Sequence, residues 1–366
     1  MSRLKARAAK RRKQAQDAEQ AGFWPELCRR IDAGQVIPII SNSVFEEQLF
    51  FLEDDEETPA DWSIGERLTD AWAAEVGYPL SEQHWLPRVA LFDRVVNSPD
   101  DRASKVRYLN WLKETLLFLA ENDGDVDPDI IEELRDDIEQ QTFSDIAVEL
   151  GYPRPPVNAE NDMLQQLAEL EMPIYITTSP FDFLERALKA NHRNPRTQIC
   201  FWSEAPATYM DEAHKMDYDF KPTIENPMVF HVFGLEAYPE SMVLNEDDYL
   251  DFLATISEDV TQKHALIPVY LRKALTKSSL ILLGYRLRDW DFRVMFRGLI
   301  NSTPSSLRRF NLAIQLDPPQ QTPAVSAKQI RKYLEKYFGD SDFTVEWNTP
   351  SGFVATLWEE WNRWRQ

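Results

Sequence analysis

The chain has 366 residues, and its 61 acidic against 40 basic side chains give a formal net charge of −21 at pH 7. Hydrophobic residues make up 43% of the sequence, which is enough for a large core and excludes a disordered acidic chain. The charge opposes sequence-independent nucleic-acid binding, and the two cysteines, Cys28 and Cys200, exclude a disulfide framework or a four-thiolate zinc site.

The charge is unevenly distributed along the chain. Residues 1–13 carry seven Lys or Arg and no acid, so residues 14–366 hold 33 basic against 61 acidic residues, or −28. We call residues 1–13 the basic arm. It has no apolar segment after it, so it is not a signal peptide, and no membrane helix is predicted. We expect a protein of the reducing cytoplasm. The arm is either a solvated helix start or a segment that docks on an acidic partner, another copy or nucleic acid.

The first part of the chain predicts one buried strand followed by a series of helices. A helix is expected from Leu4 to Asp32 with a break near Gly22–Pro25, and the apolar run Val36–Ile40 predicts a buried strand. Turn signals separate the helical patterns that follow between about 62 and 170. The helices expected in that region include Ile64–Val76, Ala103–Ala120, Ile130–Gln140 and Met163–Leu170.

Strands and helices alternate in the second part of the chain. The expected strands are Pro173–Thr177, Thr197–Phe201, Met228–Phe233, Leu280–Leu283 and Leu312–Leu316. The expected helices are Phe181–Ala190, Glu246–Ile256, Ile267–Leu275, Trp290–Ile300, Ala327–Phe338 and Val354–Trp364. This alternation predicts an α/β fold with a Rossmann-like, mostly parallel sheet, helices on both faces and a helical insertion after the first strand. The predicted organisation is an N-terminal helix at 1–33 and one domain at 34–366 that contains the insertion at about 62–170.

Polar residues follow several of the predicted strands. Ligands of open parallel sheets bind beyond the carboxyl ends of the strands, so these residues are candidates for a dinucleotide site. The candidates are Ser41, Asn42 and Ser43, then Thr178, Ser179 and Asp182, then His231, and finally Gly284, Tyr285, Arg286 and Asp289. Each also has an ordinary structural interpretation, because serine and aspartate cap helices, a strand histidine is often a hydrogen-bonded core residue, and glycine ends strands.

The candidate segments, in this order, resemble the sirtuin-like proteins of prokaryotic defence systems, which share the NAD-binding fold of sirtuin deacylases and usually hydrolyse NAD. Ile176–Glu185 resembles the family's Thr-Thr-Asn-Tyr-Asp segment, and Phe230–Gly234 resembles its strand with a histidine and a glycine. Leu283–Asp289 resembles its strand that ends in Gly-Tyr-Ser and an aspartate. The resemblance covers roughly residues 34–43 and 173–300.

The resemblance implies NAD as substrate or ligand. It implies that His231 acts as a base or ribose partner and that Ser179 holds the attacking water, while the other candidates contact the nucleotide. The sequence departs from the family at two places: Ser41-Asn42-Ser43 replaces the loop Gly-Ala-Gly-x-Ser, and Ser179 replaces the water-orienting asparagine. The paired Cys-x-x-Cys motifs of the sirtuin zinc module are missing from the sequence, so we expect no metal and no zinc-dependent deacylase.

Three functions stay open at this point. The first is an NAD hydrolase effector of a prokaryotic defence system that releases nicotinamide and ADP-ribose when a partner triggers it. The second is a catalytically degenerate domain that binds NAD or an ADP-ribose-like nucleotide as a sensor or scaffold. The third is an interaction protein without a nucleotide. The family implies a homo-oligomer, a separate activating partner protein, or both.

Overall fold

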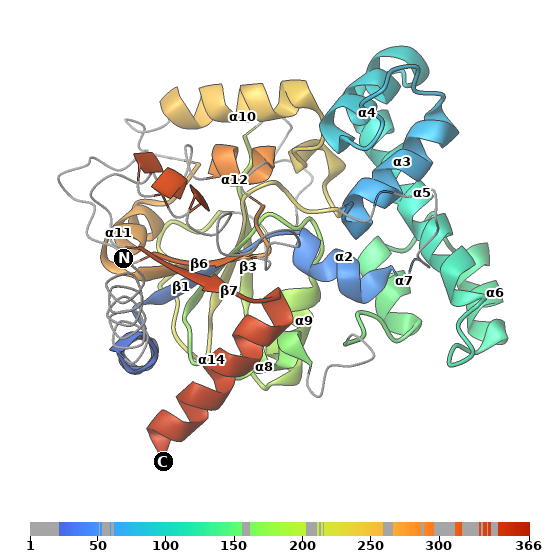
Figure 1. Cartoon of the computed structure of the whole chain (residues 1–366). Coiled ribbons are helices and arrows are strands. Elements are labelled where there is room, and N and C mark those ends of the chain that lie inside the picture. The colour runs from blue at the N-terminus through green and yellow to red at the C-terminus, as the bar shows by residue number, and fades with distance from the viewer. Residues whose placement is uncertain are drawn as a thin grey trace, which may run out of the picture.

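A parallel sheet with β1 at its centre organises the fold (Figure 1). The computed structural model describes residues 22–50, 52, 59, 62–155, 162–202, 211, 214, 216–258, 266–286, 289–295, 312–316, 329–330, 332–334, 336–337 and 343–366. The described strands are β1 (Val36–Ile40), β2 (Ile174–Thr177), β3 (Arg196–Ile199), β4 (Met228–His231), β5 (Ser279–Leu283), β6 (Leu312–Leu316) and β7 (Phe343–Trp347). They form a seven-stranded sheet in the order β3-β4-β2-β1-β5-β6-β7, in which every neighbouring pair is parallel. The predicted Rossmann-like α/β fold is confirmed.

Alternate residues of the strands contribute to two separate cores, one on each face of the sheet. Val36 and Ile40 of β1 belong to one core, and Ile37 and Ile39 belong to the other. Both faces are therefore covered, which explains why the strand is a continuous apolar run rather than an alternating one. Helices α8 (Met163–Glu169), α9 (Phe183–Ala190) and α14 (Pro350–Arg365) pack on the first face, and α10 (Glu246–Glu258), α11 (Val269–Lys277) and α12 (Trp290–Met295) pack on the second.

The segment between β1 and β2 is helical, as the sequence predicts. It contains α2 (Ser43–Leu49), α3 (Ile64–Val76), α4 (Leu86–Phe92), the π-helix η1 (Asp93–Asn97), α5 (Asp101–Ala120), α6 (Pro128–Asp136) and α7 (Phe143–Glu149), followed by α8. Figure 1 shows α3 to α6 gathered to one side of the sheet. Local signals fix the ends of α3, because Ser63 and Glu66 form a capping box and Gly77 ends the helix in the left-handed conformation.

Helix α2 and strand β7 were not expected from the sequence, and neither was the short 3-10 helix η3 (Pro239–Ser241). Helix α2 begins at Ser43, immediately after β1, where we expected a loop. Strand β7 extends the sheet at its edge beside β6. The predicted helix at Ala327–Phe338 lies partly outside the described residues, as does the end of Trp290–Ile300, and the basic arm lies wholly outside them. Of the predicted N-terminal helix, residues 22–32 are described and helical. None of the described helices is long and apolar enough to cross a membrane.

Candidate functional site

The strand register brings the predicted segments together at one edge of the sheet. Ile40 at the end of β1 is level with Thr177 of β2 and with Leu283 of β5, and Thr177 is level with His231 of β4. The residues that follow these strands therefore start from the same edge, which is where ligands of such sheets bind. This edge is the candidate site.

The loop after β1 packs directly against the end of β5. The Ser41 amide donates to the Leu283 carbonyl at 2.9 Å, and the Ser43 hydroxyl donates to the Gly284 carbonyl at 2.5 Å. Gly284 has a φ of 74°, and a side chain there would collide with Val44. In a glycine-rich first loop, the missing side chains would let a phosphate approach the backbone. Here the first loop instead packs closely against Gly284 at the end of β5.

A chain of hydrogen bonds links Ser179 to a carboxyl group through Asn42. The Ser179 hydroxyl donates to Asn42 Oδ1 at 2.8 Å, and Asn42 Nδ2 donates to Glu46 Oε1 at 2.9 Å. Asn42 and Glu46 lie four residues apart, at the N-cap and in the first turn of α2, so both side chains lie on the same face. A side-chain amide therefore lies next to Ser179 although residue 179 itself is not an asparagine.

A cavity of about 80 Å³ lies between this edge and the helical insertion. Its polar lining comes from six side chains: Asn42, Glu46, Tyr108, Thr178, Tyr249 and Asp291. Apolar side chains of the insertion also line it, among them Leu68 of α3, Leu86 of α4 and Leu112 of α5. These apolar side chains lower the local polarity, which strengthens electrostatic interactions inside the cavity.

Two carboxyl groups of the cavity have raised pKa values. Burial raises the pKa of Glu46 to about 7, with Arg286 acting against the rise and Asp291 adding to it. Burial also raises the pKa of Asp291, although its carboxylate accepts a hydrogen bond from the Tyr249 hydroxyl. A carboxyl with a pKa near 7 is suited to exchange protons at neutral pH.

His231 is fully buried, and both of its ring nitrogens are engaged. Nδ1 lies 2.9 Å from the Ser179 carbonyl and Nε2 lies 2.8 Å from Glu185 Oε1, which also accepts from the Thr197 hydroxyl at 2.8 Å. Burial disfavours the charged ring, but the Glu185 carboxylate outweighs it and raises the pKa of His231. Both neighbouring oxygens are acceptors when Glu185 is ionised, and both nitrogens donate to them only when the ring is an imidazolium. A base needs a free ring nitrogen, so in this arrangement His231 holds the Ser179 backbone in place.

The other predicted residues are divided between supporting and peripheral positions. Of all the candidates, Asn42 and Thr178 line the cavity, and Tyr285 supports it through a 3.4 Å hydrogen bond to the Thr178 hydroxyl. Asp182 pairs with Arg186 at 2.6 Å, and Arg286 pairs with Glu66 at 2.9 Å. The Asp289 amide donates to the Arg286 carbonyl.

The sequence did not reveal Glu46, Tyr249 or Asp291 as site residues. Glu46 could have been found if α2 had been recognised, because it follows Asn42 at the helical spacing of four residues. Asp291 lies in the first turn of α12, and Tyr249 lies near the start of α10. Their convergence depends on the packing of α2, α10 and α12, which no local pattern predicts.

Comparison with known proteins gives one family match. Residues 173–340 match the model of the SIR2-like domain family. The match begins at β2 and leaves out β1, the serine-containing first loop and the helical insertion. It supports a sirtuin-like NAD-binding protein. No curated protein matches the chain.

Proposed function

We propose that the protein binds NAD at the candidate site and hydrolyses it to nicotinamide and ADP-ribose. The observation that carries the proposal is the cavity at the strand ends of a sheet with a SIR2-like segment, because it brings the Asn42 amide together with the Glu46 and Asp291 carboxyls. These groups suit a ribose with its hydroxyls and a positively charged nicotinamide ring. These groups therefore match the nicotinamide riboside end of NAD, where the reaction takes place.

Hydrolysis breaks the bond from ribose C1′ to the nicotinamide nitrogen and forms a bond from C1′ to water oxygen. The electron pair of the broken bond neutralises the nicotinamide ring, so the leaving group needs no proton. A catalyst must therefore orient one water, exclude other water and stabilise the cation-like sugar.

Each requirement has a candidate residue in the cavity. Asn42 both donates and accepts hydrogen bonds, so its amide can orient the attacking water. The hydrogen bond from the Ser179 hydroxyl holds the Asn42 amide in position. The negative charge of Glu46 and Asp291 stabilises the sugar cation as it forms, and Glu46 becomes neutral when it then accepts the proton of the attacking water. His231 is a positioning residue that acts through Ser179.

The small size of the cavity supports a protein that is held inactive until it is triggered. Ligand sites commonly measure about 300–1,000 Å³, whereas this cavity measures about 80 Å³. NAD binding therefore requires the helices of the insertion to move away from the sheet. Together with the resemblance to prokaryotic defence proteins, this supports an effector that a partner protein or self-assembly opens.

One observation favours a second function, a nucleotide-binding domain without turnover. The first loop is packed against Gly284, so the place where the family's glycines would approach the pyrophosphate is filled by Ser43 and Val44. Such a domain would bind NAD or an ADP-ribose-like nucleotide as a sensor or scaffold.

The test is to incubate the purified protein with NAD, alone and with the products of neighbouring genes, and to measure free nicotinamide. We expect Glu46→Gln and Asn42→Ala to lower nicotinamide release about 100-fold or more, because positioned acid–base groups contribute about 10²–10⁴. The matched control is Glu149→Gln, the same substitution at an exposed residue of α7. NAD binding without turnover in every condition would favour the second function, and neither binding nor turnover would contradict both.

A further inference from the structure

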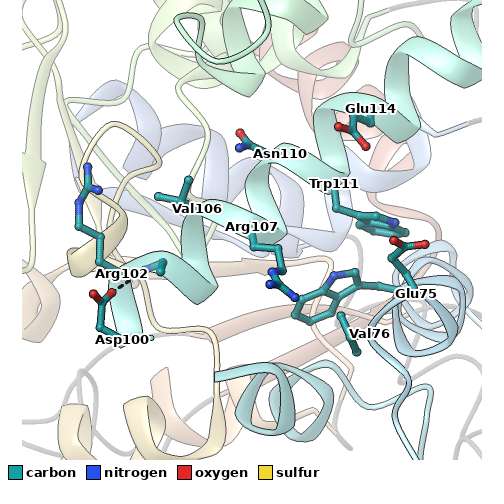
Figure 2. Close-up of a pocket in the computed structure, with 11 residues that line it drawn as sticks. Glu75, Val76, Asp100, Arg102, Val106, Arg107, Asn110, Trp111 and Glu114 are labelled. Atoms are coloured by element: carbon teal, nitrogen blue, oxygen red, sulfur yellow. Dashed lines mark hydrogen bonds between the residues drawn. The ribbon is translucent and has the colours of Figure 1, made fainter. Parts of the chain in front are cut away.

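A second and larger hollow lies on the helical insertion, between α3 and α5 (Figure 2). It has a volume of about 590 Å³ and shares no described lining residue with the strand-end cavity. We call it the α3–α5 groove. The proposed NAD chemistry makes no use of it.

The same pair of side chains occurs on both helices of the groove. Trp72 and Glu75 are three residues apart on α3, and Trp111 and Glu114 are three residues apart on α5. Residues at this spacing are neighbours on a helix surface, so each carboxylate lies beside an indole, of which Trp111 is partly exposed and Trp72 is buried. Figure 2 shows Glu75 next to the ring of Trp111, with Glu114 one turn further along α5.

The negative charges of the groove are available to a ligand, whereas its positive charges are already paired. Glu75 and Glu114 are exposed and have no ion-pair or hydrogen-bond partner among the described residues. In contrast, Arg102 binds Glu240 at 2.8 Å and Arg107 binds the buried Asp93 at 3.1 Å. Carboxylates beside indole rings attract Lys and Arg side chains through charge and cation–π contacts.

A buried donor in the groove also lacks an acceptor. Trp72 is fully buried, and its indole Nε1 has no hydrogen-bond partner in the described part of the chain. Because this atom is buried, a ligand in the groove meets the exposed carboxylates and the partly exposed Trp111, and a peptide with basic side chains supplies the matching cations.

We propose that the α3–α5 groove binds the basic arm, residues 1–13, of a second copy of this chain. The arm carries seven positive charges and no acid, against a net charge of −28 on the rest of the chain. It also contains Leu4, an apolar side chain that matches Phe118, which is 62% exposed and lies one turn beyond Glu114 on α5.

The geometry favours an arm from another copy over the chain's own arm. Residues 14–21 link the arm to the first described residue and span at most about 28 Å when fully extended. Figure 1 shows the start of the described chain at the lower left of the view and α3 and α5 at the upper right. A chain of this length folds to about 50 Å across. The link is therefore too short to bring Arg11, Arg12 and Lys13, the charges next to it, across the molecule to their own groove.

Sedimentation velocity of the full chain tests the proposal. We expect the wild type to self-associate at 0.1 M salt and to dissociate at 1 M salt, because the screening length falls from about 10 Å to about 3 Å. Glu75→Lys with Glu114→Lys should lower the association constant at least tenfold. Arg11→Glu, Arg12→Glu and Lys13→Glu together should lower it as much. Combining the two sets reverses both charges and should restore association to within about threefold.

The control is Glu132→Lys with Glu133→Lys, an equal charge change at two exposed positions of α6 outside the groove. The control should associate like the wild type, and circular dichroism should show that every variant keeps its helix content. The proposal is wrong if the wild type is monomeric at 0.1 M salt, if the control variant dissociates as readily as the groove variant, or if the combined variant stays monomeric.

Discussion

Glu185→Gln is a direct test of the buried pair beneath the candidate site. The change removes one negative charge and keeps the shape of the side chain, while His231 and Glu185 have exposed side-chain fractions of only 0% and 2%. Removing one partner of a buried ion pair costs about 3–5 kcal/mol, because the other charge is left in an apolar environment. We expect a loss of about 3 kcal/mol in the free energy of unfolding at pH 5.5.

The dependence on pH gives this prediction its sign. Glu185 raises the pKa of His231 above its usual 6.5, so the pair stabilises the fold below pH 6.5 and loses this effect as pH rises through the folded-state pKa. Burial opposes the charge of Glu185, but His231 lowers its pKa below 4.5, so its contribution is present above pH 4.5 and is lost in acid. The pair therefore stabilises the protein most between about pH 4.5 and 6.5.

In the variant, burial without the carboxylate makes protonation of His231 unfavourable, so the folded state loses stability as pH falls. The cost of Glu185→Gln should shrink to about 1–2 kcal/mol at pH 8, the value of a disturbed buried hydrogen bond. Urea unfolding followed by circular dichroism at pH 5.5 and 8.0 measures both costs, with Glu149→Gln as a control expected within about 0.5 kcal/mol of the wild type. Equal costs at the two pH values, or a cost below 1 kcal/mol at pH 5.5, would refute the ion pair.

Three further outcomes follow from the packing and charges described above. Nicotinamide release should rise with pH through about 7 as the Glu46 carboxyl loses its proton, and a profile measured between pH 5.5 and 8.5 that stays flat would exclude Glu46 as the base. Gly234→Ala should cost at least about 2 kcal/mol, since its φ is 85° and a methyl group would collide with the Ser241 backbone; an unchanged melting temperature would contradict this. Trp361→Ala should cost about 3–5 kcal/mol, because this buried indole fixes α14 to the first core, and a cost under 1 kcal/mol in urea unfolding would show that α14 is not part of it.

The fold could be predicted where a local pattern and its end signals agreed. Helix α3 has the predicted boundaries because a capping box begins it and Gly77 ends it, and β1 is a bounded apolar run. Helix α2 was missed because Ser41-Asn42-Ser43 is typical of a turn and the helix has only seven residues. Strand β7 was missed because Phe343–Trp347 carries Thr and Glu and lies at the edge of the sheet.

The location of the candidate site at the strand ends could be predicted from the sequence, but most of the side chains that line it could not. The rule that ligands bind at strand ends identified the edge at which Asn42 and Thr178 line the cavity. The opposite layer of the cavity comes from the helical insertion, whose position on the sheet is a matter of tertiary packing. The engagement of His231 by Glu185 was equally hidden, because 46 residues separate them.

The central position of β1 has a consequence for how the chain folds. Ile40 pairs with Thr177 of β2 on one side and with Leu283 of β5 on the other. Strand β1 is therefore synthesised well before either of the strands with which it pairs. At translation rates of about 5–20 residues per second, β1 spends on the order of ten seconds without a neighbour. Parallel pairing over such sequence separations is slow and leaves apolar strands exposed to aggregation. Many contacts of the helices between β1 and β2 are with one another, so these helices can form before the later strands of the sheet have been synthesised.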